Sequence, residues 1–273
     1  SSAASDVYKR QHKRRRMAVV RLEAANSLSK EMEKYFCEKF NIRPECIFRT
    51  KMPMKLDFIF AIADKLPDSK KKTLVDVPFS PQPSSMLAEG KVIPQIKKKD
   101  VLLCYPYESM DPFLKLIKDA AADPNVMTIK ITIYRLASKA MLAEYLCAAA
   151  ENGKEVTVLM ELRARFDEAN NIDWSGRLEE AGCNIIYGME NYKCHSKVCL
   201  ITKRSADGVT YITQIGTGNY NEKTARLYTD LSLMTSDAEI GRDAVTFFQN
   251  MLIGNLNGYY LSLIHISEPT RRS

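Results

Sequence analysis

The chain has 273 residues, of which 45% are hydrophobic, and a formal net charge of +7 at pH 7. This length accommodates one large domain or two ordinary ones. No apolar run approaches the roughly 20 residues of a membrane-spanning helix, and the seven cysteines lack the paired spacing of a disulfide framework, which favours a reducing compartment. The modest charge does not by itself indicate a nucleic-acid binder, but it suits a polyanionic ligand.

Both ends of the chain differ in character from the middle. Asp6–Gln11 can be encoded by GAT GTG TAT AAG AGA CAG, and the reverse complement of that DNA encodes Leu261–Ile266. These segments resemble translated transposon-end adapters from sequencing libraries. We therefore expect residues 1–11 and 261–273 to be foreign to the natural protein, which excludes His265 from the functional argument. We also expect the natural chain to continue beyond both ends.

The first part of the natural chain, residues 12–75, predicts a helix and short elements. Residues 19–42 carry a helical period around Leu28, Met32 and Phe36. Residues 76–100 contain four of the eleven prolines, which predicts a linker or a crossover along the surface.

From residue 101 onward, strands and helices alternate. Strands are predicted at 126–135, 154–162, 183–188, 197–203 and 210–216, and helices at 138–153, 173–182 and 238–252. Strand–helix–strand succession at these lengths predicts βαβ units. We therefore expect an α/β fold with a mixed, mostly parallel sheet flanked by helices. Residues 204–208 predict a hairpin turn between the last two strands.

Arginines follow two neighbouring predicted strands at the point where each strand ends. Arg135 follows the first strand, and Arg163 and Arg165 follow the second. Ligands of α/β sheets bind outside the carboxyl ends of the strands, and the planar guanidinium group suits phosphate oxygens. An ion pair with a nearby carboxylate such as Asp167 is the alternative reading, and it stays open.

The segment KCHSKVCLI contains His195, one of three histidines in the chain, two residues before Lys197. Side chains at i and i+2 of a strand share a face, so the lysine would lower the pKa of the imidazole and favour its neutral, nucleophilic form. A neutral imidazole beside cations suits attack on phosphorus. A partly buried histidine bonded to a carbonyl is the alternative. A zinc site with Cys194 and Cys199 is disfavoured, because no second ligand pair follows.

The stretch IGTGNYNEKTARLYTD is a second candidate for anion binding. Gly216 and Gly218 permit a tight turn whose amide groups can face an anion, although most such loops are merely turns. Further donors follow within the stretch: Asn219, Lys223, Arg226 and Tyr228.

Five segments in this order resemble the polyphosphate kinase family: DVLLCYPYESMDPF, IKITIYR, NGKEVTVLMELRARFDEANNIDW, KCHSKVCLI and IGTGNYNEKTARLYTDLSLMT. The resemblance covers residues 14–258. It implies reversible transfer of the terminal phosphate of ATP to inorganic polyphosphate through a phosphohistidine, with ATP or ADP and polyphosphate as the partners. His195 matches the phosphorylated histidine of the family.

The resemblance also implies roles for other residues. Arg135 and Arg165 match positions that the family associates with magnesium (Mg2+). A guanidinium has no lone pair for a metal, so we expect these arginines to hold phosphate oxygens beside the ion. Tyr228 matches a nucleotide-contacting position. We add as phosphate binders Lys197, Asn219, Lys223 and Arg226.

The implied architecture resembles the phospholipase D superfamily, whose HxK motif would be His195-Ser196-Lys197. Residues 12–90 would be the end of a helical middle (head) domain plus a linker, and residues 91–260 the first of two phospholipase-D-like domains. An amino-terminal domain and a second such domain would lie outside this chain. For the full-length protein we expect a cytoplasmic homo-oligomer with peripheral membrane association, and no nucleic-acid partner.

Two other function classes stay open. One is a phospholipase-D-like phosphodiesterase acting on lipid or nucleic acid. That class usually carries an aspartate a few residues beyond the lysine of HxK, and KVCLITK contains none. The other is a non-catalytic polyanion-binding module, because half of the family's active site would be absent from this chain and the isolated piece could be inactive.

Overall fold

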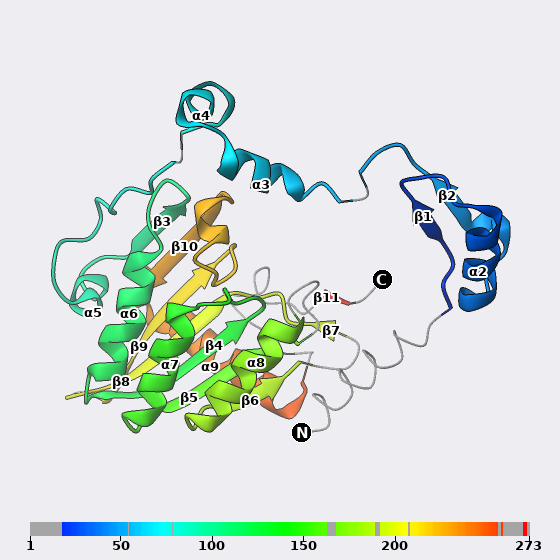
Figure 1. Cartoon of the computed structure of the whole chain (residues 1–273). Coiled ribbons are helices and arrows are strands. Elements are labelled where there is room, and N and C mark those ends of the chain that lie inside the picture. The colour runs from blue at the N-terminus through cyan, green and yellow to red at the C-terminus, as the bar shows by residue number, and fades with distance from the viewer. Residues whose placement is uncertain are drawn as a thin grey trace. The chain divides into compact units, whose positions relative to one another are not determined.

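The computed structural model describes residues 18–53, 55–77, 79–162, 168–188, 192–206, 208–255, 258 and 270–271. The described chain forms two compact units, a small one that ends at Phe79 and a large one that begins at Ser80 (Figure 1).

The small unit contains short elements only. Two strands pair in parallel, β1 (Leu22–Ala24) and β2 (Ile47–Arg49). The helical elements are α2 (Lys30–Phe40), the 3-10 turn η1 (Pro44–Cys46), α3 (Phe58–Lys65) and α4 (Asp68–Leu74).

The helix expected within residues 19–42 is confirmed only for α2. Its first turn is capped by Ser29, whose hydroxyl accepts a hydrogen bond from the Met32 amide at 3.2 Å. An N-cap residue has non-helical backbone angles, and the extended backbone of Ser29 therefore ends the helix on that side. The residues before it are free to form β1.

The large unit is built on a seven-stranded sheet with the order β3-β10-β9-β8-β4-β5-β6 (Figure 1). Its strands are β3 (Val101–Tyr105), β4 (Val126–Ile133), β5 (Glu155–Met160), β6 (Asn184–Tyr187), β8 (Val198–Ser205), β9 (Gly208–Gly216) and β10 (Asp230–Thr235). A separate antiparallel pair joins β7 (Tyr192–Lys193) to β11 (Thr270–Arg271).

The helices of the large unit are α5 (Val92–Ile96), α6 (Asp111–Ala122), α7 (Met141–Glu151), α8 (Glu168–Glu180) and α9 (Ala238–Ile253), with a 3-10 turn η2 (Thr224–Arg226). Within the described part of the chain, no helix combines the length and the apolar character that crossing a membrane requires.

The mixed α/β class is confirmed, but the expectation of a mostly parallel sheet is wrong. Only β4–β5 and β5–β6 pair in parallel, which confirms the βαβ succession through α7 and α8. The other four pairings of the sheet are antiparallel. The reason lies in the second half of the chain, where β8 and β9 form the predicted hairpin and β10 returns beside β9. Each of these connections turns the chain straight back, so neighbouring strands run in opposite directions.

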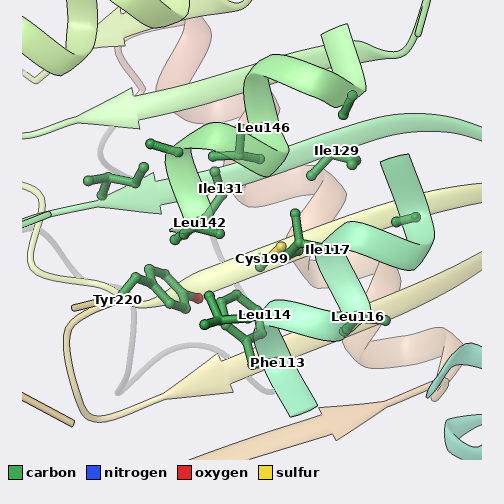
Figure 2. Packing of buried hydrophobic residues seen from close by; sticks show 14 of the residues in the cluster. Phe113, Leu114, Leu116, Ile117, Ile129, Ile131, Leu142, Leu146, Cys199 and Tyr220 are labelled. Atoms are coloured by element: carbon green, nitrogen blue, oxygen red, sulfur yellow. The ribbon is translucent and has the colours of Figure 1, made fainter. Parts of the chain in front are cut away.

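Helices cover both faces of the sheet, and the strands alternate accordingly. In β8, Cys199 and Ile201 belong to the large core cluster under α6, α7 and α8. Val198 and Leu200 instead join Phe247 of α9 in a second cluster. Figure 2 shows the larger cluster, in which Phe113, Leu116 and Ile117 of α6 and Leu142 and Leu146 of α7 pack against strand residues.

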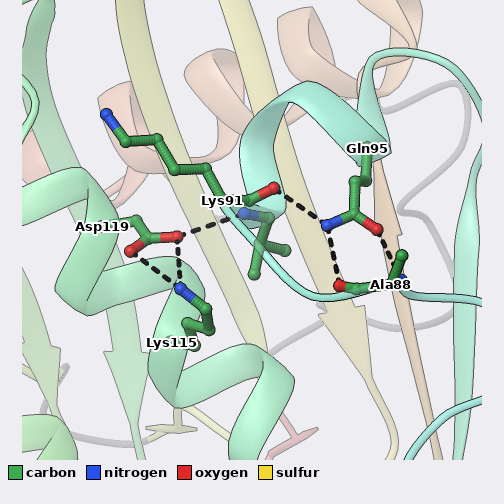
Figure 3. A network of polar contacts seen from close by, with 6 residues as sticks. Ala88, Lys91, Gln95, Lys115 and Asp119 are labelled. Carbon is green, nitrogen blue, oxygen red and sulfur yellow. Dashed lines mark hydrogen bonds and ion pairs between the residues drawn. The ribbon is translucent and has the colours of Figure 1, made fainter.

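The later half of the proline-rich segment packs into the large unit. Three residues of α5, Val92, Ile93 and Ile96, are buried in its core. The amide of Val92 donates to Asp119 on α6 at 3.1 Å, and Asp119 also binds Lys115 (Figure 3). An apolar helix face therefore anchors this end of the segment.

We predict opposite effects for alanine at two helical glycines. A Cβ on Gly241 in α9 would lie 2.5 Å from the side chain of Tyr211 on β9, whereas a Cβ on Gly176 in α8 meets nothing within 4 Å. Gly241→Ala should lower the free energy of unfolding by about 1–3 kcal/mol through overpacking. Gly176→Ala should leave it unchanged or raise it by up to about 1 kcal/mol. Urea unfolding followed by circular dichroism measures both, and equal effects would contradict this packing of α9.

Candidate active site

One end of the sheet gathers the candidate residues, because β8 begins there and its neighbours β4 and β9 end there. The register pairs Ile131 with Cys199, so β8 begins where β4 ends. It also pairs Val198 with Ile215, so β9 ends at the same place. The segments 134–135, 194–197 and 216–219 therefore converge, although each was placed by a different local pattern.

Tyr134, the first residue after β4, lies at the centre of this site. Its ring meets the imidazole of His195 edge to face, with ring centroids 5.0 Å apart and an interplanar angle of 73°. Three cations lie about the same ring: Lys197 Nζ at 5.4 Å from the centroid, Arg135 Cζ at 5.7 Å and Lys193 Nζ at 6.0 Å. The negative face of an aromatic ring attracts such cations. The sequence analysis missed both Tyr134 and Lys193.

His195 and Lys197 lie together, but strand alternation does not cause it. The chain has no regular strand at residues 194–197, and β8 begins only at Val198. His195 is exposed, whereas Lys197 is 3% exposed and donates a hydrogen bond to the backbone oxygen of His195. The ammonium group of the lysine therefore lies inside the protein, against the backbone of the histidine and the ring of Tyr134.

Burial lowers the pKa of both Lys197 and His195. Burial lowers the pKa of Lys197 to about 8, against the opposing effect of Cys194 and Asp230. The pKa of His195 is lowered from its usual 6.5, first by partial desolvation of its ring, which stays accessible on one side, and then by Lys197, Lys193 and Arg135. The neutral imidazole is thus the favoured form at pH 7, as the sequence analysis expected.

Glu161, the first residue after β5, has a backbone partner in the site. Its side chain is 1% exposed, and Oε2 accepts a hydrogen bond from the Cys194 amide at 3.1 Å. This contact ties the carboxyl end of β5 to the segment that carries the histidine. Arg163 and Arg165, which follow Glu161 in the chain, lie outside the described residues.

The loop after β9 packs against the carboxylate of Asp230. Thr217 donates its hydroxyl to Asp230 at 2.8 Å, and a Cβ on Gly218 would lie 2.5 Å from Oδ2 of Asp230. Neither Gly216 nor Gly218 has a positive φ. The glycines therefore permit close approach of Asp230 and the backbone of Leu231 rather than a left-handed turn.

The remaining predicted residues follow this loop. The side-chain oxygen of Asn219 is buried and has no hydrogen-bond partner among the described residues. Lys223, Arg226 and Tyr228 lie in or next to η2 and are exposed, Tyr228 by 62%. None of the last three contributes to the lowered pKa of His195. The structure thus brings Arg135, His195 and Lys197 together and leaves the η2 residues on the surface.

The described residues do not favour a metal cage at this site. They contain no group of three or more histidine, cysteine, aspartate or glutamate side chains that could hold a metal ion. All seven cysteines are free thiols. Burial raises the pKa of Cys194 to about 11, which opposes the thiolate form that binds zinc.

Comparisons with known proteins agree on one family. Residues 91–256 match the family model described as polyphosphate kinase C-terminal domain 1. The polyphosphate kinase of Staphylococcus epidermidis is 41% identical over 238 residues, which cover 87% of this chain and 32% of that protein. The polyphosphate kinase of Staphylococcus saprophyticus is 52% identical over 157 residues, or 58% of this chain and 22% of that protein.

A solved structure agrees with these sequence matches. The crystal structure of polyphosphate kinase from Porphyromonas gingivalis superposes with a TM-score of 0.68 and 32% sequence identity, covering 85% of this chain and 35% of that chain. This chain therefore spans about a third of the length of that structure and of the Staphylococcus epidermidis relative. Because the family model covers more than half of it, the chain belongs to the polyphosphate kinase family.

Proposed function

We propose that this chain carries the phosphate-accepting histidine of a polyphosphate kinase, and that His195 relays the terminal phosphate of ATP to inorganic polyphosphate. The observation that carries the proposal is that the exposed imidazole of His195 and the buried cation of Lys197 lie against the same Tyr134 ring, with two further cations about it. Three cations do not help a histidine that only packs in a core. They do help a nucleophile whose substrate is an anion, because they stabilise the negative charge of that substrate.

The chemistry requires a neutral imidazole, because a protonated one has no free lone pair to attack phosphorus. The lowered pKa of His195 supplies that form at pH 7. In the first step a ring nitrogen bonds to the terminal phosphorus of ATP, and the bond to the bridging oxygen breaks, so that ADP leaves. In the second step a terminal oxygen of polyphosphate attacks the same phosphorus and frees the imidazole.

The cations of the site would stabilise the transferring group, whose negative charge spreads over three oxygens. Lys197, with a pKa of about 8, is mostly protonated at pH 7. Arg135 lies beside the same ring and offers a planar guanidinium. ATP and polyphosphate are both phosphoanhydrides, so the relay runs in either direction.

Magnesium enters this proposal with the nucleotide rather than as a resident ion. Mg2+ usually keeps several waters and binds through one or two carboxylates and the substrate phosphates. Arg135, and Arg165 by the same resemblance, would hold phosphate oxygens beside the ion. Tyr228, with its exposed ring, would contact the nucleotide. Asn219, Lys223 and Arg226 would contact further phosphates.

A non-catalytic polyanion-binding module is the second candidate. The same three cations about Tyr134 favour it, since they would attract polyphosphate whether or not His195 reacts. The flanking domains, the oligomeric state and the cellular location implied by the family resemblance likewise remain proposals for the longer protein.

The first prediction concerns phosphate transfer. With magnesium and ATP labelled on its terminal phosphate, the chain should acquire a label that is labile in acid and stable in base, as expected for a phosphoramidate. His195→Ala should remove it and retain polyphosphate binding within about twofold, because the cations remain. Autoradiography measures the label, and fluorescence anisotropy with labelled polyphosphate measures binding.

The outcomes separate the two candidates. Label that survives in His195→Ala would contradict the relay through this residue. Polyphosphate binding by an unsubstituted chain that takes no label would instead favour the anion-binding module. Lys98→Met, which removes an exposed charge outside the cluster about Tyr134 and outside the proposed phosphate contacts, serves as the control for nonspecific loss of charge.

The second prediction concerns the pH dependence of His195. A nearby cation disfavours protonation of the imidazole, so Lys197→Met should raise the pKa of His195 towards 6.5. Lys223→Met should leave it unchanged. Proton NMR titration measures the midpoint, with the signal assigned by its loss in His195→Ala. An unchanged midpoint in a folded Lys197→Met chain would contradict the geometry of the pair.

A further inference from the structure

Thr132 on β4 occupies the position where the backbone pairing of β4 with β8 stops. The register runs through Ile131 opposite Cys199 and ends there. Beyond it, the hydroxyl of Thr132 replaces the backbone ladder. It donates to the backbone oxygen of Ser196 at 2.7 Å and accepts from the Val198 amide at 3.1 Å.

These two bonds hold the peptide groups on both sides of Lys197. The backbone oxygen of Lys197 itself accepts a bond from the Gly216 amide at 3.0 Å, on the β9 side. With the preceding and the following peptide planes both held, the φ and ψ angles of Lys197 are determined, and so is the direction of its Cα–Cβ bond. The lysine is thereby aimed at Tyr134 and the carbonyl of His195.

We propose that Thr132 is a positioning residue that sets the placement of Lys197 and His195 through this double hydrogen bond. The inference rests on the proposed function of His195 as the phosphate carrier. Thr132 also lies two residues before Tyr134, so the carboxyl end of β4 supplies both the hydroxyl that holds the backbone and the ring against which the side chains rest.

The side chain needs a hydroxyl, and the branched stem of threonine only helps to keep it in place. A hydroxyl is able to donate and accept at once, whereas valine, which has nearly the same shape, does neither. The branched Cβ of threonine restricts χ1, so that the oxygen stays between the two peptide groups. Thr132 is 1% exposed, and water therefore does not reach the groups that Thr132→Val would leave unpaired.

Three variants test the proposal: Thr132→Val, Thr132→Ser and Thr213→Val. Thr213 is a matched control, since it is 0% exposed in β9 of the same sheet and its hydroxyl has no hydrogen-bond partner among the described residues. Circular dichroism establishes that each variant is folded. The readouts are the NMR titration midpoint of His195 and its rate of phosphorylation by ATP.

In Thr132→Val the midpoint of His195 should rise towards 6.5, because Lys197 is no longer held near the imidazole. The rate of phosphorylation should fall by about 10- to 100-fold, the effect of a misplacement near 1 Å. Thr132→Ser and Thr213→Val should match the unsubstituted chain in both readouts. A purely structural role would lower stability without moving the midpoint.

A folded Thr132→Val chain with the original midpoint and rate would overturn the proposal. Should Thr132→Val fail to fold, Thr132→Ser decides, because a raised midpoint in that variant would show that the hydroxyl is not what holds the pair. If the unsubstituted chain takes no phosphate, the proposed function fails. The midpoints of Thr132→Val and Thr213→Val still test the positioning role by themselves.

Discussion

The burial of the Lys197 ammonium group at one end of the sheet is the constraint on which the site depends. A buried cation is costly unless its hydrogen bonds and charge are compensated. Here the compensation comes from the ring of Tyr134, the carbonyl of His195 and the more distant carboxylate of Asp230. The part of the desolvation cost that is not compensated lowers the pKa of Lys197. The positive charge that Lys197 still carries disfavours protonation of the neighbouring imidazole of His195.

The antiparallel half of the sheet makes this arrangement possible. In a parallel sheet all strands begin at one end of the sheet and finish at the other. Residues that precede one strand therefore lie far from residues that follow the neighbouring strand. Because β8 runs against β4, the residues before β8 face those after β4. Because β9 runs against β8, its terminal loop joins them. The backbone of residues 194–197 is then held by two side chains, those of Glu161 just after β5 and of Thr132 in β4, instead of a continuous ladder of backbone hydrogen bonds.

Sequence patterns predicted much of the local structure. The apolar periods located α7, α8, α9 and five of the seven strands of the sheet but not β3, β10 or α6, and the turn at 204–208 was correctly assigned to a hairpin. The strand directions were not predictable in the same way, since a strand pattern is identical in either direction. Tyr134 and Thr132 were missed because a tyrosine and a threonine at the end of an apolar strand are what β propensity alone would place there.

The sequence by itself determined the family, the mixed α/β class and the choice of Arg135, His195 and Lys197 as candidates, because these depend on motifs and periods that are local in the chain. The tertiary structure alone decided that the lysine is buried while the histidine is exposed, and that one ring unites them with Lys193 and Arg135. The physical reason is separation along the chain. Thr132 and Ser196 are 64 residues apart and meet only when β8 folds back along β4.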